Sequence, residues 1–196
     1  KVAHVVPGEK FAIKAQDAGV DAVVAEGFEA GGHNGRDETT TFCLIPMVKD
    51  SIKIPLIAAG GIGTGKGMLA AMNLGADGVQ MGSRFAASLE ASSHNNFKEE
   101  VVKVKEGDTL LTLKDVTPVR LIKNEFFNTI NDAILKGASP EEQKAILGRG
   151  RAKKGMFEGD LVNGELEIGQ VASLINDIKP VKQIINDIIN DYQIAL

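Results

Sequence analysis

The sequence predicts an α/β fold in which parallel strands alternate with helices, as in the C-terminal half of a (β/α)8 (TIM) barrel. Four short apolar runs end at or near glycine or proline, and helix-compatible segments separate them. The runs are residues 2–6, 21–25, 54–59 and 78–81. This alternation is typical of a parallel sheet with crossover helices.

A weak internal repeat supports the same fold class. Residues 18–24 and 74–80 share a helix end, a glycine, an aspartate and an apolar strand, in that order. Counting from Gly19 to Gly75 gives 56 residues (75 minus 19), which accommodates two strand–helix units at about 31 residues each. The four strands therefore predict four barrel units within residues 1–87.

The first predicted helix covers residues 9–18, between the first two strands. Its apolar residues Phe11, Ala12, Ala15 and Ala18 recur at helical spacing and are expected to be buried. Gly19 follows and is expected to end the helix in a left-handed conformation.

The third and fourth strands each end in a glycine-containing turn. Gly60 and Gly61 follow residues 54–59 and lead towards a helix expected at residues 68–74, while Gly82 and Ser83 follow residues 78–81. Backbone N–H groups at a helix N-terminus attract phosphate, and barrel enzymes often build a phosphate site after strands seven and eight. These strands are therefore predicted to be the last two of a barrel. Ordinary strand-to-helix turns are the alternative interpretation.

The remainder is expected to cover the barrel. Residues 88–168 lack the barrel pattern and are predicted to form a helical lid, with a helix start at Ser139 that combines a cap, Pro140 and Glu142. Residues 169–196 form the final segment. Its helix, residues 180–196, is expected to pack back on the barrel through one apolar face. That face comprises Val181, Ile184, Ile185, Ile188, Ile189 and Tyr192.

Composition limits the class of protein. The chain has 196 residues, 43% hydrophobic content and a net charge of −4, which disfavours nucleic-acid partners. It shows neither a run of about 20 apolar residues nor a signal-peptide pattern, so the sequence predicts a cytoplasmic protein without membrane contact. The single Cys43 is expected to be a small buried residue, and no metal site is predicted. Because Lys1 leads directly into a strand, the natural protein is expected to be longer by roughly a half-barrel.

The strongest candidate for chemistry is the loop after the second strand. Gly31, Gly32 and Gly35 surround His33, so the backbone can approach a flat ligand while an imidazole exchanges protons near neutral pH. A structural or solvent-exposed histidine is the alternative. Residues 37–41 are interpreted as a helix cap and solvated surface, and the basic run at 149–154 as a solvated helix face.

Three motifs in this order carry a resemblance to a known family. Residues 26–33 (Glu-Gly-Phe-Glu-Ala-Gly-Gly-His), 58–62 (Ala-Ala-Gly-Gly-Ile) and 80–85 (Gln-Met-Gly-Ser-Arg-Phe) resemble the FMN-dependent nitronate monooxygenases, formerly 2-nitropropane dioxygenases. They resemble equally the closely related FMN-containing enoyl-ACP reductases. The resemblance covers the family's barrel from the fifth strand onward and implies FMN as cofactor and a homodimer.

The resemblance also implies residue roles. His33 corresponds to the catalytic base or hydrogen-bond partner of the substrate. The FMN-phosphate positions correspond to Ala59, Gly60, Gly61, Gly82 and Ser83. Gly31 and Gly32 would approach the flavin edge, and Glu26 and Gln170 match polar positions around it. Arg84 and Lys66 flank the phosphate turns and could add positive charge.

Three functions stay open. The favoured one is FMN-dependent oxidation of alkyl nitronates by O2 to a carbonyl compound and nitrite, with His33 as base. The second is an NAD(P)H-dependent reductase of enoyl thioesters on acyl carrier protein. The third is a non-catalytic flavin- or phosphate-binding barrel in which His33 is structural.

Overall fold

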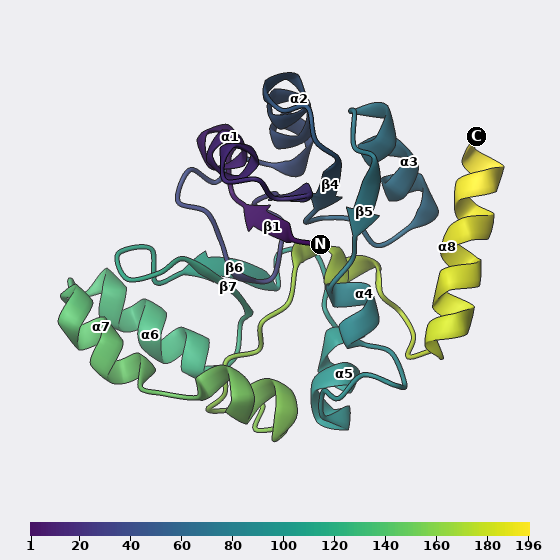
Figure 1. Cartoon of the computed structure of the whole chain (residues 1–196). Helices are drawn as coiled ribbons and strands as arrows, with labels where there is room; N and C mark the ends of the chain where they lie inside the picture. Colours follow the sequence, from purple (N-terminus) through teal and green to yellow (C-terminus); the bar gives the residue numbers. More distant parts are fainter.

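The four predicted strands form one parallel sheet in the computed structural model, which describes residues 1–196 (Figure 1). Its strands are β1 (Ala3–Val6), β2 (Ala22–Glu26), β4 (Leu56–Ala59) and β5 (Gly78–Gln80), in the order β1-β2-β4-β5. The α/β class and the parallel arrangement are therefore confirmed. The strands β1 and β5 form the two edges of the sheet, so these residues do not close a barrel among themselves.

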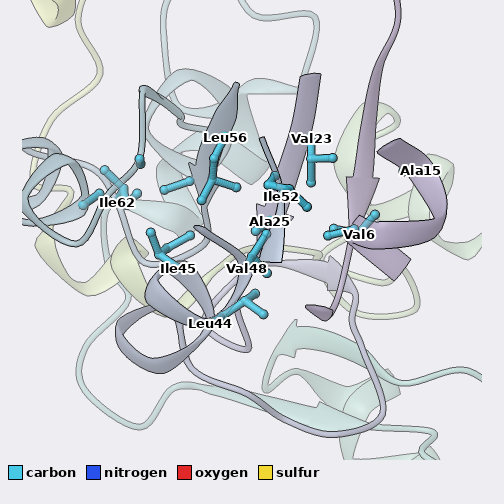
Figure 2. Packing of buried hydrophobic residues seen from close by; sticks show 14 residues of the cluster. Val6, Ala15, Val23, Ala25, Leu44, Ile45, Val48, Ile52, Leu56 and Ile62 are labelled. Carbon is cyan, nitrogen blue, oxygen red and sulfur yellow. The ribbon is translucent and has the colours of Figure 1, made fainter. Parts of the chain in front are cut away.

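Three helices connect these strands and cover one face of the sheet. They are α1 (Glu9–Asp17), α2 (Thr41–Ser51) and α3 (Gly65–Asn73). Figure 2 shows Val48 of α2 next to Ala25 of β2, and Leu44 belongs to the same core cluster as Val23 and Leu56. Leu44, Ile45 and Leu56 are fully buried, and burying each such side chain stabilises the fold by about 1.5–3 kcal/mol. This core fixes the strands that carry the loops described below.

Two details of the predicted helices are wrong. Ala12 and Ala15 of α1 are buried as expected, but Phe11 is 51% exposed and Ala18 is also exposed. Small alanines allow α1 to lie close to the sheet, which leaves the bulky ring of Phe11 at the flank of the contact. Helix α3 begins at Gly65 rather than residue 68, because the Thr64 side chain caps it by accepting a hydrogen bond from the Gly67 amide.

The expected left-handed end of the first helix is confirmed. Gly19 has φ +85°, and its amide donates to the carbonyl of Gln16. The predicted capping box at Ser139 is also present, with the Glu142 amide donating to the Ser139 hydroxyl and the Glu142 carboxylate accepting from the Ser139 amide.

The expected helical lid over residues 88–168 is only partly helical. It includes two strands, β6 (Thr109–Thr112) and β7 (Val119–Ile122), and β7 pairs with β3 (Gly32–His33) of the histidine loop. These strands form an antiparallel sheet in the order β3-β7-β6. Strand β3 has only two residues and pairs with β7 far along the chain, so no local pattern indicated it.

The other elements surround this second sheet (Figure 1). They are α4 (Ser83–Ala86), α5 (Asn95–Val101), α6 (Glu125–Leu135), α7 (Pro140–Leu147), a π-helical turn (Lys153–Phe157) and a 3-10 turn (Gln170–Leu174). Phe126, Phe127 and Ile130 of α6 pack on β7 in a separate small core. The division at residues 87 and 168 stays a prediction.

The last helix, α8 (Val181–Ala195), lies against α3, as the sequence predicted for residues 180–196. Ile184 and Ile188 are buried, but Ile185 and Ile189 are 46% and 42% exposed. The predicted apolar face is therefore only partly buried, and Ile185 and Ile189 border an apolar groove against α3 and the end of β5. No helix of the chain combines the length and the apolar character needed to span a bilayer.

The contact between α3 and α8 depends on Gly65, and it generates a test. A Cβ atom at Gly65 would lie 2.1 Å from the Tyr192 amide nitrogen and 2.2 Å from the Ile188 carbonyl oxygen. We expect Gly65→Ala to push α8 away and to lower the free energy of unfolding by about 1–3 kcal/mol. Tyr192 is the only tyrosine and tryptophan is absent, so intrinsic fluorescence reports on α8 directly.

Gly67→Ala in the same helix is the matched control for Gly65→Ala. A Cβ atom there lies 3.3 Å from the Thr64 hydroxyl and meets nothing from α8. Equal stability and equal Tyr192 fluorescence in the two variants would contradict the close contact.

Candidate functional site

The register of the parallel sheet brings three polar or small residues together at the carboxyl ends of the strands. Glu26 pairs with Ala59, and Ala59 pairs with Gln80. An open cleft of about 240 Å³ lies at this end. Its lining comprises Glu26, Glu29, Ala30, Gly31, Ala59, Gly60, Gly61, Ile62, Gln80, Gly82, Ser83, Ala86, Met156, Glu167, Ile168, Gly169 and Val171. The turns after β2, β4 and β5 therefore meet at one cleft.

The turn after β4 packs directly on the turn after β2. Gly60 has φ +90°, and a Cβ atom there would lie 2.7 Å from the Gly27 carbonyl oxygen. The Thr41 hydroxyl donates to the Gly60 carbonyl at 2.9 Å, and the Thr41 amide donates to a Glu29 carboxylate oxygen at 2.9 Å. The backbone at Gly60 is thus fixed by its contacts with Gly27 and with Thr41.

The turn after β5 leaves open space. A Cβ atom on Gly82 would meet nothing within 4 Å, although Gly82 lines the cleft. The neighbouring Ser83 hydroxyl accepts a hydrogen bond from the Gly169 amide at 3.0 Å. This bond ties the turn after β5 to the chain that returns at residue 169.

Gly31 and Gly32 of the histidine loop lie against residues of the protein itself, Gly31 against backbone and Gly32 against a side chain. A Cβ atom on Gly31 would lie 2.3 Å from the Ile168 carbonyl carbon, and one on Gly32 would lie 2.8 Å from a carboxylate oxygen of Glu167. Their small size is therefore already required by the contact with residues 167–169. Gly31 also lines the cleft, whereas Gly32 does not.

A buried arginine holds the start of the same loop. Arg120 of β7 is 1% exposed, and its guanidinium donates to the Phe28 carbonyl at 2.9 Å and lies 4.4 Å from the centre of the Phe28 ring. Burial lowers the pKa of Arg120, and the negative charges of Glu29 and Glu38 oppose that change. The arginine therefore fixes the loop that leads to His33.

Three carboxyl groups line the cleft. The Glu29 carboxylate accepts a hydrogen bond from the Thr41 amide at 2.9 Å. Burial raises the pKa of Glu26. Burial also raises the pKa of Glu167, while positive charge on His33 acts in the opposite direction. Burial therefore makes the ionised forms of Glu26 and Glu167 less stable than those of carboxylates in water.

A fourth carboxyl group lies next to this set. Glu165 is 8% exposed, and burial, followed by the charge of Glu167, raises its pKa to about 7. Arg151 acts in the opposite direction. Glu165 and Glu167 therefore form a pair of acids whose protonation is coupled.

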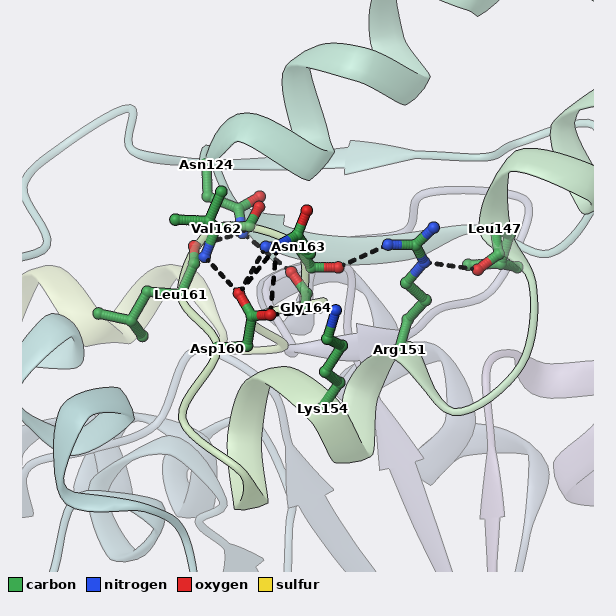
Figure 3. A network of polar contacts seen from close by, with 9 residues as sticks. All are labelled: Asn124, Leu147, Arg151, Lys154, Asp160, Leu161, Val162, Asn163 and Gly164. Carbon is green, nitrogen blue, oxygen red and sulfur yellow. Dashed lines mark hydrogen bonds and ion pairs between the residues drawn. The ribbon is translucent and has the colours of Figure 1, made fainter.

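A polar network fixes the chain just before these acids (Figure 3). The Arg151 guanidinium donates to the carbonyls of Leu147 and Asn163, and the Asn124 amide group donates to those of Leu161 and Gly164. Asp160 accepts from the Asn163 amide, which strongly lowers the pKa of Asp160. The sequence was interpreted as placing Arg151 on a solvated helix face. The structure shows instead that its guanidinium binds the backbone at Leu147 and Asn163.

The sequence-predicted residues separate into two groups. Those on the cleft wall are Glu26, Gly31, Ala59, Gly60, Gly61, Gly82 and Ser83. Gly32, His33 and Gln170 lie outside the lining. His33 is exposed on β3 and interacts electrostatically with Glu167, and Gln170 is exposed with its backbone amide bonded to the Glu29 carbonyl. The roles of all these residues stay predictions.

Sequence reasoning missed the acids at 165 and 167 as well as Arg120. The run Gly-Glu-Leu-Glu-Ile-Gly at residues 164–169 alternates acidic and apolar residues before a glycine, and this pattern could have drawn attention to them. Arg120 gave no such signal, since a single basic residue within an apolar run is also typical of an exposed strand.

Three further expectations need correction. Thr41, assigned to the solvated surface, is 8% exposed and bonds to Gly60 and Glu29. Cys43, expected to be buried, is exposed because α2 turns it away from the sheet. Arg84 does not face the cleft, since it pairs with Asp177 at 2.7 Å.

The cleft residues fit one part of a flavin mononucleotide. Gly82 leaves room beside the Ser83 hydroxyl for a phosphate, and the carboxyl groups of Glu26 and Glu167 offer polar partners for a heterocyclic ring. The volume is below the roughly 300–1,000 Å³ typical of small-molecule sites, so these residues enclose only part of such a ligand. No group of three or more potential ligand side chains is arranged for a metal ion.

Comparisons of the sequence with a family model and with curated proteins point to the same family. Residues 6–191 match the nitronate monooxygenase family model. A probable nitronate monooxygenase of Staphylococcus saprophyticus is 42% identical over 131 residues, which cover 62% of this chain and 37% of that protein.

Solved structures show the same fold. FabK from Thermotoga maritima superposes with a TM-score of 0.92 and 44% identity, covering 98% of this chain and 61% of that one. A nitroalkane oxidase from Streptomyces ansochromogenes has a TM-score of 0.82 at 24% identity, covering 98% and 57%, and this likeness shows the fold alone. The chain thus spans less than two thirds of the length of these relatives. Because the family model matches nearly all of it, the chain belongs to the nitronate monooxygenase family.

Proposed function

We propose that the cleft binds FMN and that the protein oxidises alkyl nitronates with O2 to a carbonyl compound and nitrite. The observation that carries this proposal is the meeting of Gly31, Gly60–Gly61 and Gly82–Ser83 at the carboxyl ends of parallel strands. Ligands of parallel α/β folds bind at this end. Membership in the nitronate monooxygenase family supports the choice of reaction.

The wall residues have separate proposed roles in holding the cofactor. Ala59, Gly60, Gly61, Gly82 and Ser83 would hold the phosphate, since the turn at Gly82 is open and the Ser83 O–H can still donate. Glu26 would contact the ring system from the end of β2. Gly32 and Gln170, which lie outside the lining, would act by supporting the loop rather than by direct contact.

The chemistry divides between cofactor and protein. FMN, when bound, supplies the electron transfer between substrate and O2. His33 takes the α-proton of a nitroalkane at an imidazole nitrogen or, once protonated, donates a hydrogen bond to a nitronate oxygen. Its exposed position on β3 lets the imidazole exchange that proton with solvent.

The proposal also implies the partners of the protein and its cellular location. The partners would be a small-molecule substrate and O2, acting in the cytoplasm, and the resemblance implies a homodimer without nucleic-acid or membrane partners. In the remaining alternative, a non-catalytic flavin-binding protein, FMN would bind but no substrate would turn over.

A second candidate is the NAD(P)H-dependent enoyl-ACP reductase branch. Its support is the 44% identity with FabK over 98% of this chain, compared with 24% for the nitroalkane oxidase. The cleft is compatible with either reaction, because each requires FMN at the same turns.

One experiment separates the candidates. The purified FMN-loaded protein is mixed aerobically with propionate 3-nitronate and, separately, anaerobically with NADH. We expect O2 uptake with nitrite release in the first mixture. Rapid bleaching of the flavin by NADH together with turnover of a crotonyl thioester would instead establish the reductase, and bound FMN without either reaction would indicate the non-catalytic protein.

His33→Gln tests the proposed base. Because His33 is exposed and makes no side-chain hydrogen bond, we expect FMN content to persist while kcat falls by about 10²–10⁴-fold. His4→Gln on the exposed part of β1 is the control and should keep parental kcat. Parental turnover in His33→Gln would remove the catalytic role.

Gly82→Val tests the phosphate position by equilibrium FMN titration. The open space at Gly82 allows the fold to accept a side chain, but that side chain would occupy the cleft. We expect FMN affinity to fall by about tenfold or more, with an unchanged melting temperature of the FMN-free protein. Gly78→Val, which also meets nothing within 4 Å but lies outside the cleft lining, should bind FMN normally. Similar affinity in both variants would place the phosphate elsewhere.

A further inference from the structure

We propose that Met156 is a specificity-determining residue: its side chain forms the apolar wall of the cleft that receives the alkyl group of the substrate and limits the length of that group. The inference rests on the proposed function, because it concerns the substrate that binds beside the cofactor. Met156 has been given no role in that function so far, and no sequence motif singled it out.

Met156 differs from most other apolar residues of the lining in its exposure. The seven apolar residues of the lining are Ala30, Ala59, Ile62, Ala86, Met156, Ile168 and Val171. Ala86 and Met156 are partly exposed, whereas the other five are buried. Ala86 has only a methyl group, so Met156 supplies most of the apolar surface that a ligand in the cleft can contact.

The backbone that carries Met156 is fixed by contacts with two other segments. Met156 belongs to the π-helical turn at residues 153–157, and such turns occur frequently at functional sites. A Cβ atom on Gly155 would lie 2.3 Å from the Glu165 carbonyl oxygen, so the turn lies directly on the chain that returns to the cleft. The His94 amide donates to the Met156 carbonyl at 2.8 Å and ties the turn to the start of α5. The main chain therefore holds Met156 in place while its side chain remains partly exposed.

Two ion pairs support the same turn. Lys154 pairs with Asp160 at 3.0 Å (Figure 3), and Lys153 pairs with Glu158 at 3.0 Å. Neither lysine lines the cleft. Met156 is the one residue of the turn that lines the cleft, so the turn contributes an apolar side chain to it and no charge.

A methionine at this position suits the alkyl group of a substrate rather than its charged end. The thioether side chain is apolar, unbranched and polarizable, so it adapts to a hydrocarbon chain. The negatively charged oxygens of a nitronate need hydrogen-bond donors, and a methionine side chain offers none. The cleft holds only about 240 Å³, so a single side chain changes which ligands fit. Met156 therefore admits short alkyl groups and excludes longer ones.

The first test measures binding without turnover. Carboxylates and nitronates share a planar, negatively charged group with two oxygens, so propionate and octanoate serve as unreactive probes with a short and a long alkyl chain. Isothermal titration calorimetry of the FMN-loaded protein gives the Kd of each probe. We expect Met156→Ala to raise the ratio of octanoate affinity to propionate affinity by about tenfold or more, because loss of the thioether opens space for the longer chain. An unchanged ratio would overturn the proposal.

Three further variants separate the wall of the cleft from the stability of the turn. Met156→Leu keeps an apolar side chain of similar volume and should keep the parental ratio. Phe157→Ala removes the neighbouring side chain, which is 49% exposed and does not line the cleft, and should also keep that ratio. Met156→Phe adds volume and should lower the ratio, so the proposal stays testable even where Met156→Ala is unstable. An equal change in Phe157→Ala and Met156→Ala would contradict the proposal.

Contact of Met156 with the cofactor instead of the substrate gives a different result. Met156→Ala would then weaken FMN binding while the ratio of octanoate to propionate affinity stayed at the parental value. Equilibrium FMN titration of the same variants measures this effect, and that combination of results would refute the assignment of Met156 to the alkyl group.

The second test uses turnover of ethyl nitronate and hexyl nitronate. We expect Met156→Ala to raise the ratio of kcat/KM for the hexyl compound to that for the ethyl compound by about tenfold or more, mainly through KM. The same ratio in Met156→Ala and the parent would argue against the proposal. A parent that oxidises neither nitronate contradicts the proposed function instead, and the binding of the two carboxylates then decides the present inference separately.

Discussion

The site depends on close backbone contacts that only glycine permits. Gly60 lies against the Gly27 carbonyl, and Gly31 and Gly32 lie against residues 167–169. Each contact leaves no volume for a Cβ atom, so the turns after β2 and β4 and the returning chain are brought within van der Waals distance. The cleft is the space that remains where these segments diverge. Main-chain packing at Gly31 and Gly60 therefore fixes part of the cleft wall, and side chains such as Gln80 and Met156 complete it.

Electrostatics impose a second constraint on this geometry. A cleft proposed to hold a phosphate also contains three carboxyl groups, and full ionisation of all three would repel an anion. The Thr41 amide donates a hydrogen bond to the Glu29 carboxylate, and burial raises the pKa of both Glu26 and Glu167. The acids lie towards the ends of β2 and the returning chain, whereas Gly82 and Ser83 present a turn free of carboxylates. The cleft is therefore polarised, with separate regions suited to a phosphate and to a heterocyclic ring.

The sequence predicted the structure correctly where the residues of a single segment determine its conformation. The four parallel strands, the positive φ of Gly19 and the capping box at Ser139 are confirmed, since apolar runs, glycine and capping residues act locally. Strand β3 was missed because it is very short and pairs with the distant β7, whereas β6 and β7 form a hairpin within residues that were assigned to a helical lid. Glycine next to a histidine predicted a close approach but not the approaching group: the resemblance implied a flavin, and the structure shows residues 167–169.

The position of His33 follows from the same pairing. By joining β7 through Gly32 and His33, the loop leaves the histidine exposed and buries the glycine next to it. An exposed group can exchange protons with water, but its charge is then weakly controlled by the protein interior. Glu167 contacts both regions, since it lines the cleft and lies against Gly32. Glu167 therefore connects the wall of the cleft with the strand edge that carries Gly32 and His33, whereas Arg120 and Glu29 are bonded to the Phe28 carbonyl and to Thr41.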